Sequence, residues 1–376
     1  MLTLKYLLPF LCLTPIAAQG TDPLFNGKNL DGWINVNCAE STWTVRDEMI
    51  VCSGQPTGLL RTDRQFQNFV LEVEWRFTNP GGNAGIFVWA DPIATTGQPF
   101  TRSVEVQVMD GEGDLQSQIA RNAYTTHGDV FPIWGATMVP DRPHPRGSQR
   151  CLPTEARSKP AGEWNQYKII CIDGTLRLSV NGKFVSGGTE INPRKGYICL
   201  EAEGAEVMFR NFKLTELAHQ PPLGPDEIAN VDRGLRHLFD GLSLTGFRGE
   251  TGAWSAGRGS LRSDPSGVAL WTEDTFSDVE IVIDVRSSQR EGATAANESG
   301  VLLRGLDSPL VPFSGISGRG WHRMIITLRG GQLSATVDGE SFIENRSLEG
   351  LPATGPIGLR HRGSPMQFMN LYARRL

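Results

Sequence analysis

An internal repeat divides the chain into two similar parts and so limits the folds that it can adopt. Residues 24–27 read Leu-Phe-Asn-Gly, and residues 238–241 read Leu-Phe-Asp-Gly. Residues 66–76 likewise match residues 276–286, and the matches extend to the last strand-like segment of each copy. Because the copies agree from end to end, we predict that each folds as one complete structural unit.

A segment without apolar periodicity separates the two copies. Residues 218–236 contain three prolines and lack the apolar spacing of a helix or a strand, as is typical of a linker. We therefore predict a first domain over residues 21–217 and a second, shorter domain over residues 237–376.

The pattern within each copy is that of antiparallel β-sheet. Leu71, Val73 and Trp75 alternate with Glu72 and Glu74, which places the apolar side chains on one face of a strand. The 43 glycines and 23 prolines fit many short strands joined by tight turns. Strands with one apolar face pack as pairs of sheets, so we expect an all-β protein with two β-sandwich domains in tandem.

The first residues have the layout of an export signal. Lys5 precedes an apolar run at residues 6–13, and small residues follow at Ala17 and Ala18. This layout predicts a signal peptide over residues 1–20 and a protein exported to the periplasm or the extracellular space. No later segment approaches the roughly 20 apolar residues of a membrane-spanning helix, so we expect no membrane span.

Charge and cysteine content narrow the classes of partner. The chain carries 36 basic and 41 acidic residues, a near balance that argues against nucleic acid and favours a neutral or small partner. Five cysteines follow the predicted signal peptide, and Cys38 could pair with Cys52 in an oxidising compartment. No pair of cysteines has the spacing of a zinc site or of a CxxC redox centre.

The two copies differ by one long insertion. Gly85 and Trp164 of the first copy are separated by roughly 60 more residues than their counterparts Gly300 and Trp321, and loops of that length are usually functional. We therefore expect the chemistry to lie in the first domain, so that a chain ending near Leu217 keeps its activity and the second domain is non-catalytic. The insertion contains polar side chains suited to catalysis, namely Glu105, Gln107, Asp110, His127, Asp129 and His144.

Six segments occur together in an order that points to a known family. They are LFNGKNLDGW at 24–33, GNAGIF at 82–87, VEVQVMD at 104–110, GEWN at 162–165, VNGK at 180–183 and FRNFKLTEL at 209–217. This set resembles the 3-keto-disaccharide hydrolase domain over residues 22–217, and residues 237–376 resemble it more weakly, as a degenerate second copy. The resemblance implies a concanavalin-like jelly roll whose curved sheet forms a sugar cleft. It also implies cleavage of glycosides that are already oxidised at carbon 3 of the sugar.

One segment departs from the family pattern. Residues 127–138 match the family at His127 and Asp129 but have Trp134 where similar members commonly have a second histidine. A role of that histidine is therefore not transferred to this chain. Trp134 is instead a candidate for stacking against a sugar ring.

Two polar residues of the insertion are expected to face the cleft. Glu105 and Gln107 alternate with Val104, Val106 and Val108, so their side chains should point away from the core. A solvated strand face would give the same pattern, but the long adjoining insertion favours a cleft. We take Glu105 as a candidate base and Gln107 as a candidate substrate ligand.

The same strand argues against ordinary double displacement. A retaining glycosidase needs two carboxylates about 5–5.5 Å apart. The strand offers only Glu105 at the paired positions, because Gln107 is not a nucleophile and Asp110 falls on the opposite parity. A 3-keto sugar offers another route, since its ketone acidifies the hydrogen on carbon 2. Removal of that hydrogen by one base can expel the substituent on carbon 1, by elimination or with net hydrolysis.

A polar loop supplies the other catalytic candidates. His127 is followed two residues later by Asp129, so the imidazole can act as a general acid or base. Together with His144 these residues could instead hold a divalent cation that stabilises an enolate, although their spacing is not diagnostic. The sequence itself requires no cofactor.

The remaining candidates are expected to bind substrate. Arg76 could hold an oxyanion, although an arginine at the matching position of the second copy favours a structural ion pair with Glu74. Trp89 would offer an indole platform for a sugar if it is exposed, and core packing is the alternative. Glu201 shares parity with Cys199 and could bind sugar hydroxyls. The full set of candidate substrate-binding residues is Gln107, Trp89, Asp110, Trp134, His144, Glu201 and Arg76.

These observations predict an exported enzyme that cleaves a 3-keto glycoside, with Glu105, His127 and Asp129 as its catalytic residues. One alternative is a lectin-like protein that binds carbohydrate without cleaving it, because a sandwich fold alone does not settle function. The other is a hydrolase of unoxidised glycans, which the amide at Gln107 disfavours.

Overall fold

The computed structural model describes most of the chain after residue 17. The described ranges are residues 18–110, 125–264, 266–287, 299–308, 311–313, 316, 320–362 and 365–376. The predicted signal peptide lies outside these ranges except for residues 18–20, which begin strand β1 (Ala18–Asp22).

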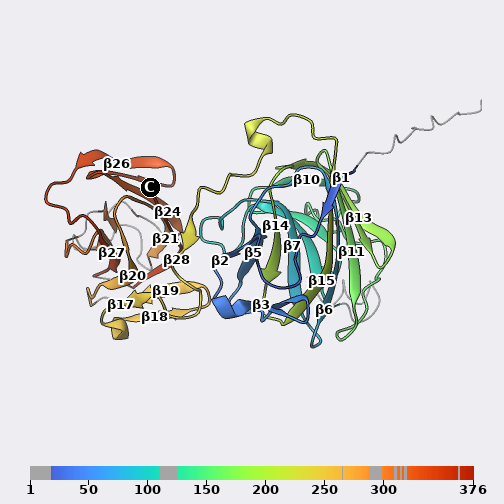
Figure 1. Cartoon of the computed structure of the whole chain (residues 1–376), viewed down its shortest axis with the longest axis horizontal. Helices are drawn as coiled ribbons and strands as arrows, with labels where there is room; N and C mark the ends of the chain where they lie inside the picture. Colours follow the sequence, from blue (N-terminus) through green and yellow to red (C-terminus); the bar gives the residue numbers. More distant parts are fainter. Residues whose placement is uncertain are drawn as a thin grey trace, which may run out of the picture.

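The first part of the chain folds into two antiparallel sheets (Figure 1). Among the described residues, the larger sheet has nine strands in the order β10-β13-β12-β11-β6-β15-β4-β3, with β1 paired to β15. Its other strands are β3 (Trp43–Arg46), β4 (Met49–Cys52), β6 (Phe69–Phe77), β10 (Thr137–Pro140), β11 (Asn165–Ile172), β12 (Thr175–Val180), β13 (Lys183–Asn192) and β15 (Val207–Leu217).

The smaller sheet has the order β2-β5-β14-β7-β8-β9. Its strands are β2 (Trp33–Val36), β5 (Gly58–Thr62), β7 (Asn83–Ala90), β8 (Ser103–Met109), β9 (Val130–Ile133) and β14 (Tyr197–Ala202). Strand β7 therefore lies between β14 and β8, which are far apart in the sequence.

The core lies between these sheets, where the alternation of side chains predicts it. On β6, Leu71, Val73 and Trp75 belong to one buried cluster, whereas Glu72 and Glu74 point the other way and are partly exposed. The three valines of β8 join the same cluster. The described residues contain short 3-10 turns but no α-helix, so the prediction of an all-β fold is confirmed. None of these residues forms a helix long and apolar enough to cross a membrane.

The last part of the chain repeats the strand order of the first. Its larger sheet runs β18-β19-β28-β21-β24-β25-β26, with β16 paired to β28, and its smaller sheet runs β17-β20-β27-β22-β23. These strands are β16 (Arg236–His237), β17 (Phe247–Arg248), β18 (Trp254–Gly257), β19 (Ser260–Ser263), β20 (Leu270–Phe276), β21 (Val279–Ser287), β22 (Gly300–Leu302), β23 (Val311–Pro312), β24 (His322–Arg329), β25 (Gln332–Val337), β26 (Glu340–Ser347), β27 (Gly355–Arg360) and β28 (Met366–Arg375). We call residues 18–217 the N-terminal unit and residues 236–376 the C-terminal unit.

A side-chain contact is repeated along with the strands. The guanidinium of Arg76 lies 4.7 Å from the ring centre of Trp164, and that of Arg286 lies 4.6 Å from the ring centre of Trp321. The same stack at matching positions of both units is the packing that the internal repeat would produce.

The predicted linker, residues 218–236, packs against the N-terminal unit. Gln67 donates a side-chain hydrogen bond to the carbonyl of Pro221 at 2.7 Å. Further along, Asp232 forms an ion pair of 2.6 Å with the buried guanidinium of Arg61. The segment therefore connects the two units along a path that its contacts to the N-terminal unit hold in place (Figure 1).

The two units lie side by side and share a hydrophobic cluster (Figure 1). The loop between β7 and β8 is bound at this junction, because Asn370 donates hydrogen bonds to the carbonyls of Thr95 at 3.1 Å and Gln98 at 2.9 Å. Arg323 donates to the carbonyl of Ala94 at 2.7 Å. The C-terminal unit thus covers part of the outer face of the smaller N-terminal sheet. The buried residues of the shared cluster are Val36, Leu59, Phe87, Ala90, Tyr197, Cys199, Leu235, Val282 and Tyr372.

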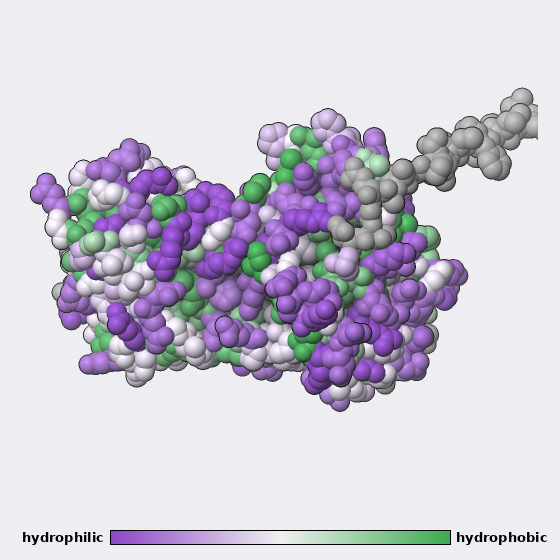
Figure 2. All heavy atoms as spheres, viewed as in Figure 1, coloured by the Kyte–Doolittle hydropathy of each residue, from purple (hydrophilic) through white to green (hydrophobic). Residues whose placement is uncertain are grey.

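Polar side chains cover most of the surface visible in Figure 2, with apolar ones scattered among them. Most large apolar side chains of the described residues lie instead inside the two sandwiches and at the junction between the units.

The cysteines after residue 20 are free, buried thiols. The sulfur of Cys38 donates to the carbonyl of Pro56 at 3.8 Å, and the sulfur of Cys52 accepts from the backbone N–H of Gly54 at 3.3 Å. Burial raises the pKa of Cys38 to about 12, so its thiol stays protonated. The disulfide considered for Cys38 and Cys52 is not formed.

Candidate active site

A cavity of about 450 Å³ opens on the outer face of the smaller N-terminal sheet. Glu105 and Gln107 reach it from β8, and Glu201 and Glu203 reach it from β14 and the residues just after it. Both β8 residues thus lie opposite the core-facing valines of their strand. The aromatic part of the wall consists of Phe100, Phe131 and Trp134.

A glycine makes room for the carboxylates. Gly85 lies on β7 between Glu201 and Glu105, and a Cβ atom at this position would lie 2.7 Å from Oε2 of Glu201 and 3.0 Å from Oε1 of Glu105. Any larger residue would push the two carboxylates apart. The absence of a side chain on β7 is therefore what lets groups from β8 and β14 meet.

Burial and mutual repulsion keep protons on these carboxyls. Desolvation, followed by repulsion from Glu203, raises the pKa of Glu105 to about 8, and the positive charge of Arg150 acts in the opposite direction. Desolvation, followed by the charge of Glu105, raises the pKa of Glu201. Oε2 of Glu201 is buried and finds no hydrogen-bond partner among the described residues. At neutral pH the cluster therefore holds protons that it can donate, and the fraction of Glu105 that is ionised can accept one.

Arg150 brings a positive charge to the cavity wall. Its Nη1 donates to Oγ1 of Thr125 at 2.6 Å and to Oδ2 of Asp129 at 3.1 Å. The guanidinium also stacks on Phe131, with its carbon 3.3 Å from the ring centre. Asp129 is fully buried behind the arginine and is held by two hydrogen bonds of 3.1 Å from the backbone and hydroxyl of Thr126. The structure therefore places Asp129 behind Arg150 rather than on the cavity wall, and its catalytic role stays a prediction.

Gln107 connects three segments of the cavity wall by hydrogen bonds. Its Nε2 donates to Oδ1 of Asn83 at 2.8 Å and to the carbonyl of Ala84 at 3.0 Å, and its Oε1 accepts from the hydroxyl of Thr125 at 2.9 Å. The amide thus links β7 and β8 to the segment that positions Arg150. An amide can make these three bonds at once, whereas a carboxylate could not donate two of them.

His127 lies in the core and not in the cavity. Its ring packs 5.4 Å from that of Trp75 and 5.7 Å from that of Tyr167, and Nδ1 lies 3.0 Å from the carbonyl of Met109. Burial lowers the pKa of His127 to about 4, so the ring is neutral and Nδ1 donates to that carbonyl. The structure therefore does not place His127 on the cavity wall, and its catalytic role stays a prediction. Gly128, with a positive φ of 76°, turns the chain between His127 and Asp129.

The cation site considered for His127, Asp129 and His144 is not formed. His144 is buried, and its Nδ1 accepts a hydrogen bond from the backbone N–H of Arg146 at 3.0 Å, away from the cavity wall. In the part of the chain that the structure describes, no three His, Cys, Asp or Glu side chains are grouped so that they could hold a metal ion.

Trp89 belongs to the core. It is fully buried, and its indole N–H donates to the carbonyl of Gln67 at 2.9 Å. The residue has a positive φ of 54°, at a bulge where the register of β7 shifts between its partners Tyr197 and Cys199 on β14. A bulge interrupts the alternation of side chains, so Trp89 and Phe87 point to opposite faces. The predicted sugar platform at Trp89 is therefore wrong.

Two other candidates also lie away from the cavity. Arg76 belongs to β6 in the opposite sheet, where it stacks on a tryptophan as described above. Its expected partner Glu74 pairs instead with Arg210 at 2.8 Å. Oδ2 of Asp110 accepts from the backbone N–H of Gly81 at 2.8 Å, so this carboxylate lies where β7 begins and β8 ends, opposite to the loop that joins them.

Trp134 stands exposed at the rim. It follows β9 with a positive φ of 51°, 44% of its surface is accessible, and it lines the same cavity as Glu105. An exposed indole beside a polar cavity is suited to the apolar face of a sugar ring. Trp134 thus stays a candidate for stacking.

Sequence reasoning missed several residues of the cavity wall. Glu203 had a clear signal, because it lies two residues after Glu201 and so shares its parity. Asn83 lies within the GNAGIF segment, and Arg150 lies within the long insertion. Their contacts to Gln107 and Asp129 depend on which strands become neighbours, and the local pattern does not contain that information.

Comparison with known proteins agrees with the resemblance. Residues 20–215 match the model of the 3-keto-alpha-glucoside-1,2-lyase-like domain. The 3-keto-disaccharide hydrolase of Bacteroides thetaiotaomicron is 26% identical over 180 residues, which is 43% of this chain and 56% of that relative. The chain thus spans little more than half the length of this curated relative.

Solved structures with a similar arrangement also cover about half of the chain. A candidate glycosyl hydrolase from Parabacteroides distasonis aligns with 53% of this chain and 94% of its own, at 22% identity and a TM-score of 0.39. A carbohydrate-binding module from Bacillus subtilis aligns with 49% of this chain and 96% of its own, at 11% identity and a TM-score of 0.36. By the family match, which takes in just over half of its residues, the chain belongs to the 3-keto-alpha-glucoside-1,2-lyase-like domain family.

Proposed function

We propose that this chain is an exported enzyme that cleaves glycosides oxidised at carbon 3 of the sugar, with its active site in the cavity of the N-terminal unit. The observation that carries the proposal is Glu105, a buried carboxyl with a pKa raised to about 8 on the wall of that cavity. A base with a pKa near neutral pH, held on a rigid strand, is suited to removing a weakly acidic C–H proton. The layout of residues 1–20 supports the proposal of export to the periplasm or the extracellular space.

In the proposed reaction, the carboxylate of Glu105 takes the proton from carbon 2, next to the ketone. The electrons of that C–H bond first enter an enolate over carbon 2, carbon 3 and its oxygen. They then form a double bond between carbons 1 and 2 as the bond from carbon 1 to the leaving oxygen breaks. The leaving oxygen takes a proton, which Glu201 or Glu203 can supply because burial raises the pKa of both. Addition of water across the new double bond completes a net hydrolysis, whereas release before that step gives the product of a lyase.

Arg150 is the proposed stabiliser of the enolate. Negative charge develops on the oxygen of carbon 3 as the proton leaves, and a fixed cation nearby lowers the free energy of that state. Arg150 lowers the pKa of Glu105, so its charge acts within the same cavity. The contacts to Asp129 and Phe131 hold the guanidinium in place before the reaction begins.

We propose that the C-terminal unit is a degenerate copy without this chemistry. The strand pairing places Pro312 and Arg360 at the positions that correspond to Gln107 and Glu201. Arg360 forms an ion pair with Asp307 instead of facing another carboxylate. No counterpart of the acidic cluster is therefore found at these positions.

The proposal is tested by incubating the protein with a 3-keto glucoside and measuring release of its leaving group. Glu105→Gln should lower kcat by roughly 10²–10⁴-fold, the range typical of general acid–base catalysis, because the amide keeps the shape but loses the basicity. The matched control is Glu72→Gln, which makes the same change on the far sheet, where Glu72 lies 3.6 Å from Lys168 in a partly exposed ion pair. A Glu105→Gln variant with nearly normal kcat on the 3-keto substrate would refute the assignment.

A second candidate function is the cleavage of unoxidised glycosides by double displacement. It is favoured by the second and third carboxyls, Glu201 and Glu203, which the sequence did not place beside Glu105. The unoxidised parent glucoside in the same assay separates the two, because only double displacement would cleave it with retention at carbon 1. Binding of both sugars without turnover would instead identify a lectin-like protein.

A further inference from the structure

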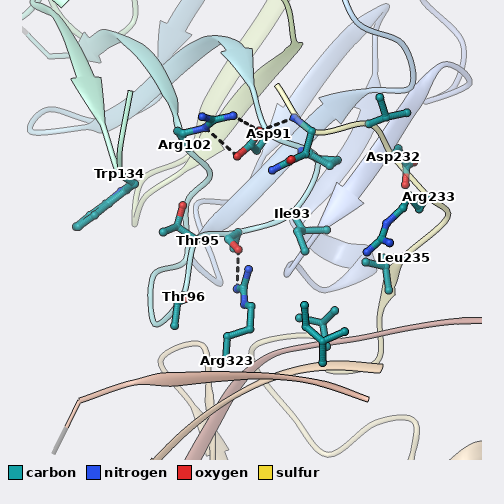
Figure 3. Close-up of a pocket in the computed structure, with 16 residues that line it drawn as sticks. Asp91, Ile93, Thr95, Thr96, Arg102, Trp134, Asp232, Arg233, Leu235 and Arg323 are labelled. Carbon is teal, nitrogen blue, oxygen red and sulfur yellow. Dashed lines mark hydrogen bonds and ion pairs between the residues drawn. The ribbon is translucent and has the colours of Figure 1, made fainter. Parts of the chain in front are cut away.

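A second cavity, of about 590 Å³, lies between the two units and meets the first at Trp134. One wall is the loop between β7 and β8, which carries Ile93, Thr95 and Thr96. The opposite wall belongs to the C-terminal unit, from which Arg323 rises toward that loop (Figure 3). Because Trp134 lines both spaces, the acidic cavity and the inter-unit cavity are neighbours at the indole.

The charges around the inter-unit cavity are already paired. Asp91 pairs with Arg102 at 3.0 Å (Figure 3). Arg233 pairs with Glu280 at 2.8 Å. Each of the other charged residues on its wall, Asp232 and Arg323, has an oppositely charged partner as well. A charged ligand would have to compete with these pairs, so the cavity is suited to a neutral one.

The uncharged part of the wall is largely aliphatic. Ile93 and Leu235 line it from one side, and Val282 and Ile325 line it from the C-terminal unit. Trp134 adds an aromatic surface at the boundary with the acidic cavity. A sugar needs many hydrogen-bond partners when it is buried, whereas an apolar ring fits aliphatic and aromatic walls.

Several contacts fix the two walls of the inter-unit cavity relative to each other. Arg323 forms an ion pair of 2.7 Å with the buried Asp284, which also accepts a hydrogen bond of 2.9 Å from the backbone N–H of Gly97. Gly97 leaves room for Trp321, since a Cβ atom there would lie 2.4 Å from the indole. These contacts keep the β7–β8 loop at a set distance from the C-terminal unit.

We propose that the inter-unit cavity binds the leaving group of the glycoside, and that this leaving group is a neutral aglycone with an apolar ring. The identity of the whole substrate rests on the proposed function, whereas the binding of an apolar ring rests on the cavity itself. The C-terminal unit then contributes to substrate selection without taking part in bond cleavage.

The test fills the cavity and compares two leaving groups. Ile325→Trp places an indole in the inter-unit cavity, and Thr96→Trp does the same from the opposite wall. The ratio of kcat/KM for a phenyl 3-keto glucoside to that for a methyl 3-keto glucoside should fall at least about tenfold in both variants. The matched control is Leu242→Trp at an exposed site of the C-terminal unit outside the cavity, and it should keep the wild-type ratio.

A binding measurement tests the cavity even if no turnover is found. Titration calorimetry with unoxidised phenyl and methyl glucosides should show tighter binding of the phenyl compound to the wild-type protein, and both filled variants should lose this preference.

An unchanged kcat/KM ratio and an unchanged preference for the phenyl glucoside in folded variants would overturn the proposal while leaving the proposed function intact. A larger loss for a 3-keto disaccharide than for the phenyl glucoside would also overturn it, because the occupant would then be a sugar. Absence of turnover by the wild type with the phenyl preference retained would instead refute the proposed function alone.

Discussion

Gly85 is the residue on which the candidate site depends most directly. It has no side chain at the point where Glu105 and Glu201 approach each other over β7. The alternation along β8 was enough to predict which way Glu105 faces. Alternation did not predict the surroundings of Trp89 or His127. A bulge in β7 changes the direction of the Trp89 side chain, and the left-handed Gly128 turns the chain next to His127.

Gly85→Ala should lower kcat/KM on a 3-keto glucoside at least tenfold with the backbone retained. Since φ at this position is not in the left-handed region, alanine fits the backbone, but its Cβ would lie 2.7 Å from Oε2 of Glu201 and 2.9 Å from the ring of Phe87. The matched control is Gly252→Ala, because a Cβ there meets nothing within 4 Å. Steady-state kinetics and thermal unfolding separate displacement of the carboxylates from loss of the fold. Full activity in a normally folded Gly85→Ala variant would contradict the placement of the two carboxylates.

At the scale of elements, the site arises from the order of strands in the smaller sheet. β8 and β14 lie far apart in the chain, and β7 brings them within reach of each other. The sequence shows that each strand carries an outward glutamate, but not that the two strands share a neighbour. This is why the sequence predicted one carboxylate on β8 and only a substrate-binding role for Glu201, whereas the structure has a cluster of three carboxyls.

The buried carboxyls that β8 and β14 bring together predict that the free energy of unfolding falls as pH rises from about 6.5 to about 8. Glu105 has an ordinary pKa near 4.5 when unfolded and about 8 when folded, so the folded state keeps a proton that the unfolded chain has released. Stability from this proton is complete below the unfolded pKa and is lost as pH approaches the folded pKa. His127, with its pKa lowered to about 4, has the opposite dependence, but that ends near its unfolded value of 6.5. Above pH 6.5 the dependence therefore comes from Glu105 and from its neighbour Glu201, whose pKa burial also raises.

The measurement is the free energy of unfolding from urea titrations at pH 6.5 and pH 8. The contribution of Glu105 over this interval is up to about 2 kcal/mol, since one pKa unit corresponds to about 1.4 kcal/mol. Glu105→Gln should reduce this dependence, because it removes the Glu105 proton and the charge that helps to raise the pKa of Glu201. The Glu72→Gln control should keep the wild-type dependence. An equal loss of stability in Glu105→Gln and in the wild type would show that Glu105 does not hold the proton.

At the scale of the whole molecule, the repeat predicted two units but not their dependence on each other. A signal for that dependence was present in β7, where Ile86, Phe87 and Val88 are apolar on both parities. Such a run is typical of a strand that is covered on both faces. The inner face packs in the core of the N-terminal unit, and Phe87 on the outer face packs in the cluster shared with Val282 and Tyr372.

Removal of residues 218–376 should therefore destabilise the N-terminal unit and impair catalysis, contrary to the expectation from sequence that a chain ending near Leu217 keeps its activity. The truncation exposes Leu59, Phe87 and Tyr197, which are buried at the junction in the full chain. It also frees the β7–β8 loop, whose Phe100 packs 5.7 Å from Phe87 and lines the acidic cavity. We expect the apparent Tm to fall by about 5 °C or more, aggregation in size-exclusion chromatography, and a lower kcat/KM in the soluble fraction. A chain ending at Leu217 that stays monomeric, with the Tm and kcat/KM of the full chain, would show that the junction carries neither stability nor the shape of the site.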